Sequence, residues 1–241
     1  MSRRLQTLYC ELLASYGPQG WWPVPGRAGA RGFDSRGYHP GDYRKPADPQ
    51  GRFDVAVGAV LTQNTAWSNV EQAMERLAAA GVRSPADVLA CPPGRLARLV
   101  RPSGYYNAKA RKLRELAAFF AARSGSRPPG REQLLAVWGV GEETADSILL
   151  YAFRQPVFVI DTYTRRFLAR HGLAQGSEPY AALQAMFHEA LGPAPDLFNE
   201  YHALIVRHQK RERRARPRPA AGTGATVGRL VPKRPSRHNP A

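Results

Sequence analysis

The sequence predicts an all-α protein, and three observations lead to this fold class. Apolar residues recur at helical spacing through most of the chain, glycine, proline or serine interrupts the pattern at regular intervals, and segments with strand-like alternation are hard to find. The short apolar run at residues 157–160 follows Pro156 and is too short to change this prediction. With 241 residues and 43% hydrophobic content, the chain can bury a real core.

The expected helices follow one another in order with short connections. Each begins or ends at a glycine, proline, serine or capping residue, because these residues favour turns and helix ends over helix interiors. Asp161, for example, stands where an N-cap would start the helix at residue 162. The expected helices span residues 53–65, 67–80, 85–90, 94–100, 107–122, 131–137, 142–153, 162–171, 179–191 and 195–208.

Two segments are too rich in glycine, proline and arginine to join a core. Residues 26–52 are expected to form a long surface loop. Residues 210–241 mix arginine, lysine and proline with few apolar residues and are expected to form a disordered basic tail. Such a tail either adds non-specific affinity for a polyanion or is merely solvated. The predicted catalytic domain is therefore residues 1–209.

Composition and charge limit the classes of function. The formal net charge of +16 and the pI near 10.6 favour a partner that is a polyanion, such as nucleic acid. Two cysteines without a pattern indicate a reducing compartment, and neither a signal segment nor an apolar run of membrane-spanning length is found. The six histidines show no metal-ligand spacing. We therefore expect a cytoplasmic, nucleoid-associated protein that binds no membrane and no metal.

The most informative stretch runs from Leu134 to Arg166. Gly139 and Gly141 flank Val140 after an apolar run, so the chain can turn tightly and expose backbone N–H groups where the next helix begins. Such a hairpin can hold a DNA phosphate without reading sequence, although an isolated pair of glycines also serves ordinary helix-to-helix turns. Asp161 then follows the apolar run at residues 157–160.

These elements resemble the endonuclease III superfamily of DNA glycosylases, the helix-hairpin-helix-GPD proteins. The strings VWGVGEETA and VIDTYTRR match the hairpin and aspartate patterns of the family, VLTQNT resembles its first helix and DNA-facing segment, and GYYNAKA resembles a further element. The resemblance covers about residues 53–210 in the order of the family. It implies a two-lobed all-α fold with the active site in the interlobe cleft. The central lobe would span residues 55–153, and the second lobe would combine the N-terminal segment with residues 155–209.

The resemblance also implies roles for individual residues. Asp161 would be the catalytic carboxylate that stabilises the sugar cation and orients or deprotonates the attacking water. Gln63 and Asn64 would enter the gap left by a flipped base or touch the opposite strand, unless they simply end a helix. The remaining residues expected to contact DNA are Gly139, Val140, Gly141, Thr144, Lys109 and Arg165.

Two departures from the family pattern bear on the chemistry. Glu143 stands where members with lyase activity carry the lysine nucleophile, and a carboxylate cannot form an imine. The segment that corresponds to the family's iron–sulfur ligands contains no cysteine, and Cys10 and Cys91 cannot supply four thiolates. We therefore expect a monofunctional enzyme without a cofactor.

The base is predicted from the N-terminal aromatic residues. Trp21 and Trp22 are adjacent in a glycine- and proline-rich loop and resemble the W-W-P element of 3-methyladenine-type members, with Phe53 as a candidate for the opposite wall. Alkylated purines carry positive charge and would gain a cation–π interaction between such rings. Alternatively, these rings only seal the N-terminal segment against the body of the protein.

The prediction is therefore a monomeric glycosylase for alkylated purines such as 3-methyladenine in duplex DNA. One alternative keeps the fold and changes the lesion to an oxidised, deaminated or mismatched base. The other is a helix-hairpin-helix DNA-binding module without catalysis.

Overall fold

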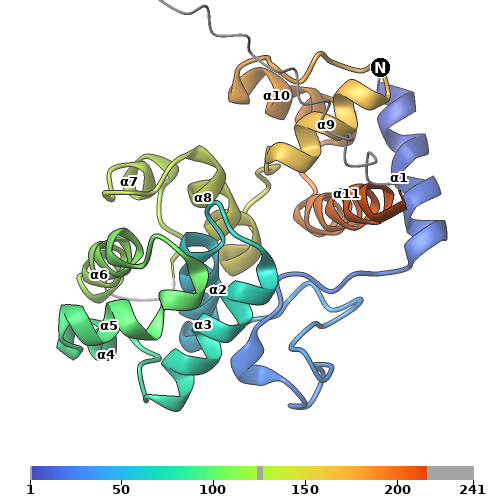
Figure 1. Ribbon diagram of the computed structural model, residues 1–241. Coiled ribbons are helices and arrows are strands. Elements are labelled where there is room, and N and C mark those ends of the chain that lie inside the picture. Colours follow the sequence, from blue (N-terminus) through green and yellow to red (C-terminus); the bar gives the residue numbers. More distant parts are fainter. Residues whose placement is uncertain (1, 124–126, 216–241) are drawn as a thin grey trace, which may run out of the picture.

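The computed structural model describes residues 2–123 and 127–215, and all regular secondary structure in these residues is helical. The predicted fold class is thus confirmed. Two groups of helices lie side by side and are joined by extended segments (Figure 1). The expected helices are all present, although several begin or end a few residues away from their predicted limits.

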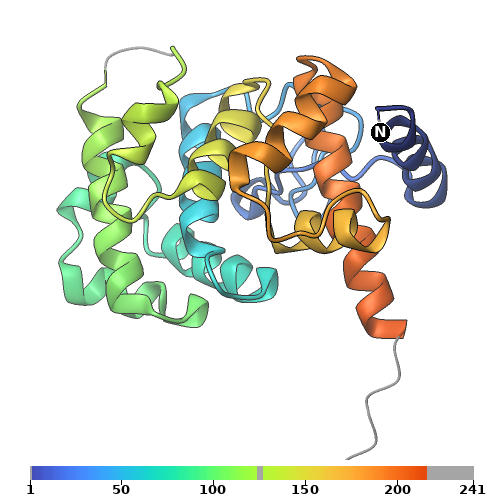
Figure 2. The same cartoon turned by 90° about the horizontal axis from the view of Figure 1, so that it is seen from above.

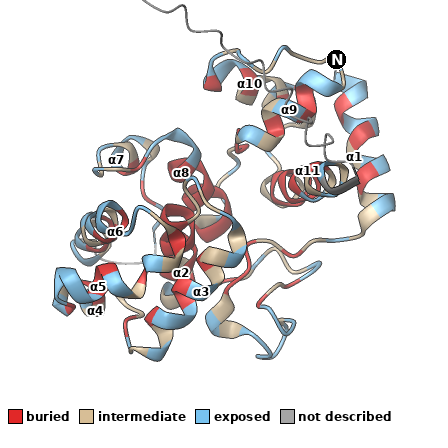
Figure 3. Ribbon diagram, viewed as in Figure 1, coloured by how far each residue is buried: buried red, intermediate tan, exposed pale blue. Residues whose placement is uncertain are grey.

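The central lobe is built around helix α2 (Pro49–Leu61), which is buried along almost its whole length (Figure 3). Asp48 caps its first turn by accepting a hydrogen bond from the Gly51 backbone N–H at 3.0 Å. The helices around it are α3 (Trp67–Ala79), α4 (Pro85–Ala90), α5 (Pro93–Leu99), the 3₁₀ turn η2 (Arg101–Ser103), α6 (Tyr106–Ala121), α7 (Arg131–Leu135) and α8 (Glu142–Ser147). Helix α8 continues into a turn of π-helix, η3 (Ile148–Ala152), which packs on α2.

The second lobe combines both ends of the described chain. It contains α1 (Ser2–Tyr16), α9 (Thr162–Arg170), α10 (Tyr180–Leu191) and α11 (Pro195–Ala215). Helix α1 packs on α10 and α11 through Leu5, Leu8 and Leu12, and the Tyr201 hydroxyl donates to the Leu5 carbonyl at 2.9 Å. Figure 2 shows α1 at the outer edge of this lobe.

Two limits of the second lobe differ from expectation. Helix α1 was not predicted, although Leu5, Leu8 and Leu12 have helical spacing. Helix α11 continues through Ala215, so the boundary predicted at Lys210 is wrong: arginine, lysine, glutamate and alanine favour helix until Pro217 approaches. The rest of the predicted tail, residues 216–241, lies outside the described residues.

The segment between α1 and α2 is anchored to both lobes. Apart from the 3₁₀ turn η1 (Pro25–Arg27) it has no regular structure, and it follows the lower right of the molecule in Figure 1. Arg36 pairs with Glu71 of α3 at 2.7 Å, and the Tyr43 hydroxyl donates to the Glu200 carboxylate of α11 at 2.8 Å. The expected surface loop is therefore a fixed part of the structure.

A buried carboxylate joins three helices close to the junction of the lobes. Asp146 of α8 is fully buried and accepts hydrogen bonds from Arg131 of α7 at 2.7 and 3.2 Å. The Gln184 amide of α10 donates to the same carboxylate at 2.8 Å and to the Phe158 carbonyl at 2.7 Å. Because Gln184 belongs to the second lobe, this network fixes one lobe against the other.

Candidate active site

Asp161 lies at the entrance of α9, where an extended and buried segment meets the helix. Phe158 and Ile160 are almost completely buried, and the Ile160 backbone N–H donates to the Tyr180 hydroxyl at 3.2 Å. The Asp161 side chain caps α9 by accepting the Thr164 backbone N–H at 2.7 Å. Its side chain is only 13% exposed, so the carboxylate is held in one orientation with little water around it.

A buried histidine supports the second oxygen of this carboxylate. His202 of α11 places its Nε2 atom 3.5 Å from the Asp161 Oδ2 atom, and its Nδ1 atom is 2.5 Å from the Tyr151 hydroxyl. If Nε2 carries the proton toward Asp161, Nδ1 is the acceptor and Tyr151 the donor. The π-helical turn η3 carries Tyr151, and turns of this kind are common at functional sites. From the sequence alone His202 is equally suited to packing within a helix and to a pocket, so its contact with Asp161 is a finding of the structure.

The protonation state of Asp161 follows from these partners. Burial raises the pKa of the carboxyl, but His202 and the Thr164 N–H stabilise the anion more strongly. The net result is a pKa below the ordinary value, so Asp161 is a carboxylate at neutral pH. Tyr151 remains neutral because its complete burial raises its pKa well above the usual range.

Glu143 is the second carboxyl group of the site. It lies in the first turn of α8, directly after the hairpin, and the residue as a whole is exposed. Desolvation of the carboxyl raises its pKa to about 7, and the Asp161 charge acts in the same direction, while His202 and Arg165 oppose it. The site therefore holds one carboxylate that is ionised at neutral pH and one that titrates near it.

Replacing Glu143 with glutamine should change how the thermal stability depends on pH, because the variant lacks the desolvated carboxyl group. Below pH 4.5 the carboxyl is protonated in both folded and unfolded chains, and between pH 4.5 and about 7 only the unfolded chain ionises. Ionisation of Glu143 therefore lowers the stability of the wild-type protein through this interval, relative to Glu143→Gln. We expect the variant to have a higher Tm than the wild type at pH 8 and nearly the same Tm at pH 4. The exposed neighbour offers a control, Glu142→Gln, and parallel melting curves for Glu143→Gln and wild type at every pH would contradict the shift.

The two tryptophans join the aromatic cluster beside His202. Trp21 is partly exposed and its ring lies 5.8 Å from the His202 ring, whereas Trp22 is buried against Tyr151 at 5.1 Å and Trp67 at 5.3 Å. A Cβ atom at Gly58 of α2 would come within 2.8 Å of the Trp22 indole nitrogen, so only glycine lets the ring approach this closely. Trp22 is thus a packed residue, and Trp21 is the ring that remains accessible.

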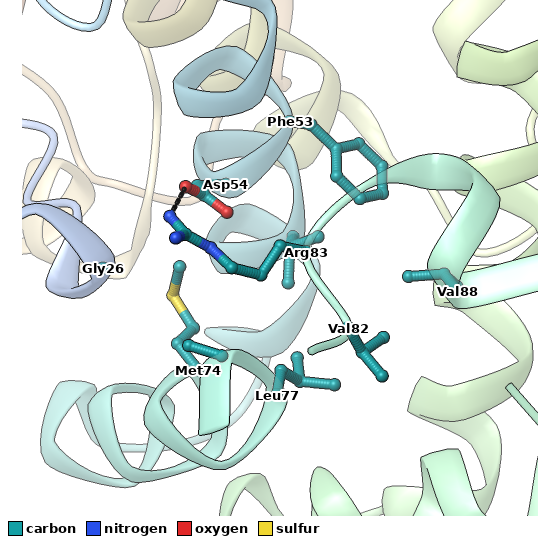
Figure 4. A pocket seen from close by; sticks show the side chains of 10 residues that line it. Gly26, Phe53, Asp54, Met74, Leu77, Val82, Arg83 and Val88 are labelled. Atoms are coloured by element: carbon teal, nitrogen blue, oxygen red, sulfur yellow. Dashed lines mark ion pairs between the residues drawn. The ribbon is translucent and has the colours of Figure 1, made fainter. Parts of the chain in front are cut away.

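Phe53 is not brought together with the tryptophans. It is 3% exposed and packs edge-on against Phe120, and within the described residues no ring contact joins it to Trp21 or Trp22. Figure 4 shows it beside the Asp54–Arg83 pair in a cavity of 20 Å³, which has room for a water molecule and not for a base. The aromatic residue that borders the tryptophans from the central lobe is Trp67, at the start of α3. The sequence signal for it was its position two residues after the end of the LTQNT segment.

The predicted hairpin residues are held together by Gln63. Its amide donates to the Gly139 carbonyl at 3.1 Å and to the Thr144 hydroxyl at 2.9 Å, and its oxygen accepts from Lys112 at 2.5 Å. Gly139 has a φ of +86°, and a Cβ atom there would collide with Lys112, so the turn requires glycine. Gln63 therefore braces the hairpin in this structure. The next residue, Asn64, is exposed and has a left-handed backbone conformation.

Around this turn, Val140 is buried whereas Gly141 is exposed at the N-cap of α8. A neighbouring residue was not predicted: Trp138 is 44% exposed and its ring lies 3.9 Å from the Arg111 guanidinium. The pair places an aromatic ring and a cation on the surface next to the hairpin.

Two of the predicted phosphate contacts are occupied by other partners. Lys109 is 2% exposed, and its ammonium donates to the carbonyls of Leu61 at 2.8 Å and Ser103 at 2.6 Å. Burial lowers its pKa to about 8. The prediction that Lys109 contacts a phosphate is wrong, because the ammonium holds the end of α2 against η2. Arg165 binds the carbonyls of Gly176 and Glu178 at 3.1 and 2.7 Å, so it fastens the loop after α9.

The fold and this site define a class of protein that repairs DNA by removing bases. A hairpin before one helix, an aspartate at the start of another and two helical lobes occur together here. The family model described as "HhH-GPD superfamily base excision DNA repair protein" matches residues 57–193. The chain belongs to this superfamily and is a DNA glycosylase of base excision repair, with DNA as its partner.

Known proteins agree with this assignment. A provisionally named DNA repair glycosylase of Methanocaldococcus jannaschii is 35% identical over 85% of this chain and 86% of its own length. Endonuclease III of Thermotoga maritima is 32% identical over 59% of this chain and 65% of its own length. Among solved structures, the H. pylori 3-methyladenine DNA glycosylase bound to 1,N6-ethenoadenine has a TM-score of 0.65 and 26% identity, covering 88% of this chain and 96% of that one.

The chain does not fit the iron–sulfur cluster that the resemblance to endonuclease III implies. Such a cluster needs four thiolates, whereas this sequence has two cysteines, Cys10 exposed on α1 and Cys91 buried beside α4. In residues 2–123 and 127–215, no group of three or more potential metal ligands occurs, and no helix is long and apolar enough to cross a membrane.

Proposed function

We propose that the protein is a monofunctional glycosylase that hydrolyses the N-glycosidic bond of alkylated purines in duplex DNA. The observation that carries the proposal is the pair of carboxyl groups, Asp161 and Glu143, at the positions of the family's aspartate and lysine. A glutamate cannot form the imine that β-elimination requires, so the nucleophile left to the enzyme is water.

In the proposed reaction the damaged nucleotide is flipped out of the duplex toward Asp161. The bond between C1′ and the base nitrogen breaks, and its electron pair leaves with the base. The Asp161 carboxylate stabilises the cationic sugar, and a water molecule adds to C1′ and gives up its proton to a carboxylate of the site. His202 is a positioning residue, because it contacts Asp161 and holds the carboxylate ionised.

The aromatic residues support the choice of an alkylated purine. A cationic base is attracted both to the face of an indole ring and to a carboxylate, and its glycosidic bond is already weakened. We propose that Trp21 forms one wall of the base pocket and that Trp67, in place of Phe53, is the facing ring. The structural similarity to a 3-methyladenine DNA glycosylase supports this proposal. We further propose that the enzyme acts as a monomer.

Product analysis tests the proposal directly. Wild-type protein would be incubated with methylated duplex DNA and with oligonucleotide duplexes that contain ethenoadenine, uracil or thymine glycol. We expect free 3-methyladenine in the chromatogram, abasic sites left intact, and no adduct after borohydride treatment. Release of only uracil or thymine glycol would instead support an endonuclease III-like specificity, a trapped adduct would contradict the monofunctional mechanism, and no release from any substrate would favour a binding module.

A further inference from the structure

The segment between α1 and α2 forms one side of a cavity that the reaction described above does not use. The cavity has a volume of 280 Å³ and lies between this segment and α11. Its lining combines two aromatic rings with three cations and an amide: Trp21, Tyr38, Arg36, Arg207, Lys210 and Gln19.

The wall that carries Tyr38 is fixed by hydrogen bonds. The Asp34 carboxylate accepts the backbone N–H groups of Arg36 and Tyr38 at 2.8 and 2.9 Å. The Arg36 guanidinium lies 5.5 Å from the Tyr38 ring and reaches Glu71 of α3. Tyr38 is therefore held in place before any ligand arrives, so ordering this residue adds little to the entropic cost of binding.

The cavity adjoins the catalytic carboxylate through two contacts. Trp21 lines the cavity and also packs against His202, the partner of Asp161. On the other side, the Lys210 ammonium lies 5.7 Å from the ring of Tyr163, which follows Asp161 in the first turn of α9. Trp21 and Lys210 thus connect the lining of this cavity to residues beside Asp161 on α11 and α9.

The charge of the lining favours an anion next to a flat group. The lining holds three cations, Arg36, Arg207 and Lys210, and one carboxylate, Asp34, whose oxygen already accepts two backbone N–H groups; the charge of Arg36 is paired with Glu71 of α3. Burial raises the pKa of the Tyr38 hydroxyl, the charges of Arg36 and Arg207 oppose this shift, and those of Glu71 and Asp34 add to it. Aromatic rings with cations beside them are the usual means by which proteins hold unpaired nucleotides.

We propose that this cavity is a second nucleotide subsite, which binds the nucleotide next to the flipped one in the damaged strand. Its base would stack on Tyr38, and its phosphate would lie between Arg207 and Lys210. The proposal rests on the proposed function, in that it assumes a flipped nucleotide at Asp161.

Binding experiments test the subsite without any turnover. The probe is a duplex with a tetrahydrofuran abasic analogue and 2-aminopurine on its 5′ side, on its 3′ side or in the opposite strand. We expect wild-type protein to change the fluorescence of one flanking 2-aminopurine in the damaged strand, and Tyr38→Leu to remove that change and weaken binding about tenfold. Arg207→Gln should lower the slope of log K against log salt by about 1.

A matched control is Arg95→Gln, which removes the same charge from an exposed residue of α5, on the far side of the central lobe (Figure 1). It should leave fluorescence and affinity unchanged. If Tyr38→Leu and Arg207→Gln both behave like Arg95→Gln, the subsite does not exist. A response only from 2-aminopurine in the opposite strand would assign the cavity to that strand and overturn the proposal. Since no readout needs base release, an inactive wild-type enzyme with an intact fluorescence response would disprove the proposed function alone.

Discussion

Asp161→Asn should lower the single-turnover rate of base release by a factor of about 100 to 1000, the usual cost of removing one preorganised electrostatic contact to a transition state. The neutral amide cannot balance the positive charge that develops on the sugar. Asparagine still accepts a hydrogen bond from the Thr164 N–H, so the cap of α9 and the fold are retained. Affinity for a duplex with an abasic analogue should change less than threefold, because the substitution leaves the hairpin and the surface cations unchanged.

A second N-cap aspartate offers the control for this variant. Asp48 caps α2 in the same manner, and Asp48→Asn should keep the wild-type rate. Rates would be measured on duplexes with a single lesion under enzyme excess, and affinity by fluorescence anisotropy. An Asp161→Asn enzyme that releases bases at the wild-type rate would exclude Asp161 as the catalytic carboxylate.

Among the substitutions considered, Asp146→Ala should lower the free energy of unfolding most. The expected loss is about 3–5 kcal/mol, the typical cost of removing one partner from a buried ion pair. The Arg131 guanidinium would be left without its two hydrogen bonds to the carboxylate, and the Gln184 amide would lose its bridge between α8 and α10. For a chain of this length, a loss of this size corresponds to a decrease in Tm of about 6–20 °C. Thermal unfolding followed by circular dichroism measures it.

The same arginine provides the matched control. Arg131 also pairs with Glu142 at 3.4 Å, but that carboxylate is 48% exposed, and exposed pairs contribute at most about 1 kcal/mol. Glu142→Ala should therefore lower the Tm by no more than a few degrees. Equal losses for Asp146→Ala and Glu142→Ala would mean that burial of Asp146 does not strengthen its pairing.

The helices could be predicted from the sequence because their signals are local. The helix predicted at residues 85–90 is observed as Pro85–Ala90, where Ser84 and Asp87 form a capping box, and the helix predicted at residues 67–80 is α3. The π-helical turn at Ile148–Ala152 has no comparable local signal, since it depends on how Tyr151 meets α2 and α11. Helix α1 has a weaker signal, because its buried face consists of only three leucines at helical spacing.

The site was predicted less completely, because it depends on which faces of the helices pack together in the fold. Asp161, Glu143 and the hairpin stand in one continuous stretch and could be recognised together. The burial of Lys109 could not, because its partners are carbonyl groups of Leu61 and Ser103, and any residue has a carbonyl group. Where several basic residues stand close together, the sequence does not indicate which of their side chains is buried.

The construction of the second lobe from both ends of the chain affects how relatives should be compared. The residues that match the family model, 57–193, contain the hairpin, Glu143 and Asp161. They do not contain Trp21, Trp22, His202 or the wall with Tyr38, which come from the flanking segments. Proteins that share only the middle of this chain therefore share Asp161 without the surfaces around it. Under the proposed base pocket, alignment of residues 18–48 and 199–210 is the sequence comparison expected to group relatives by the base they remove.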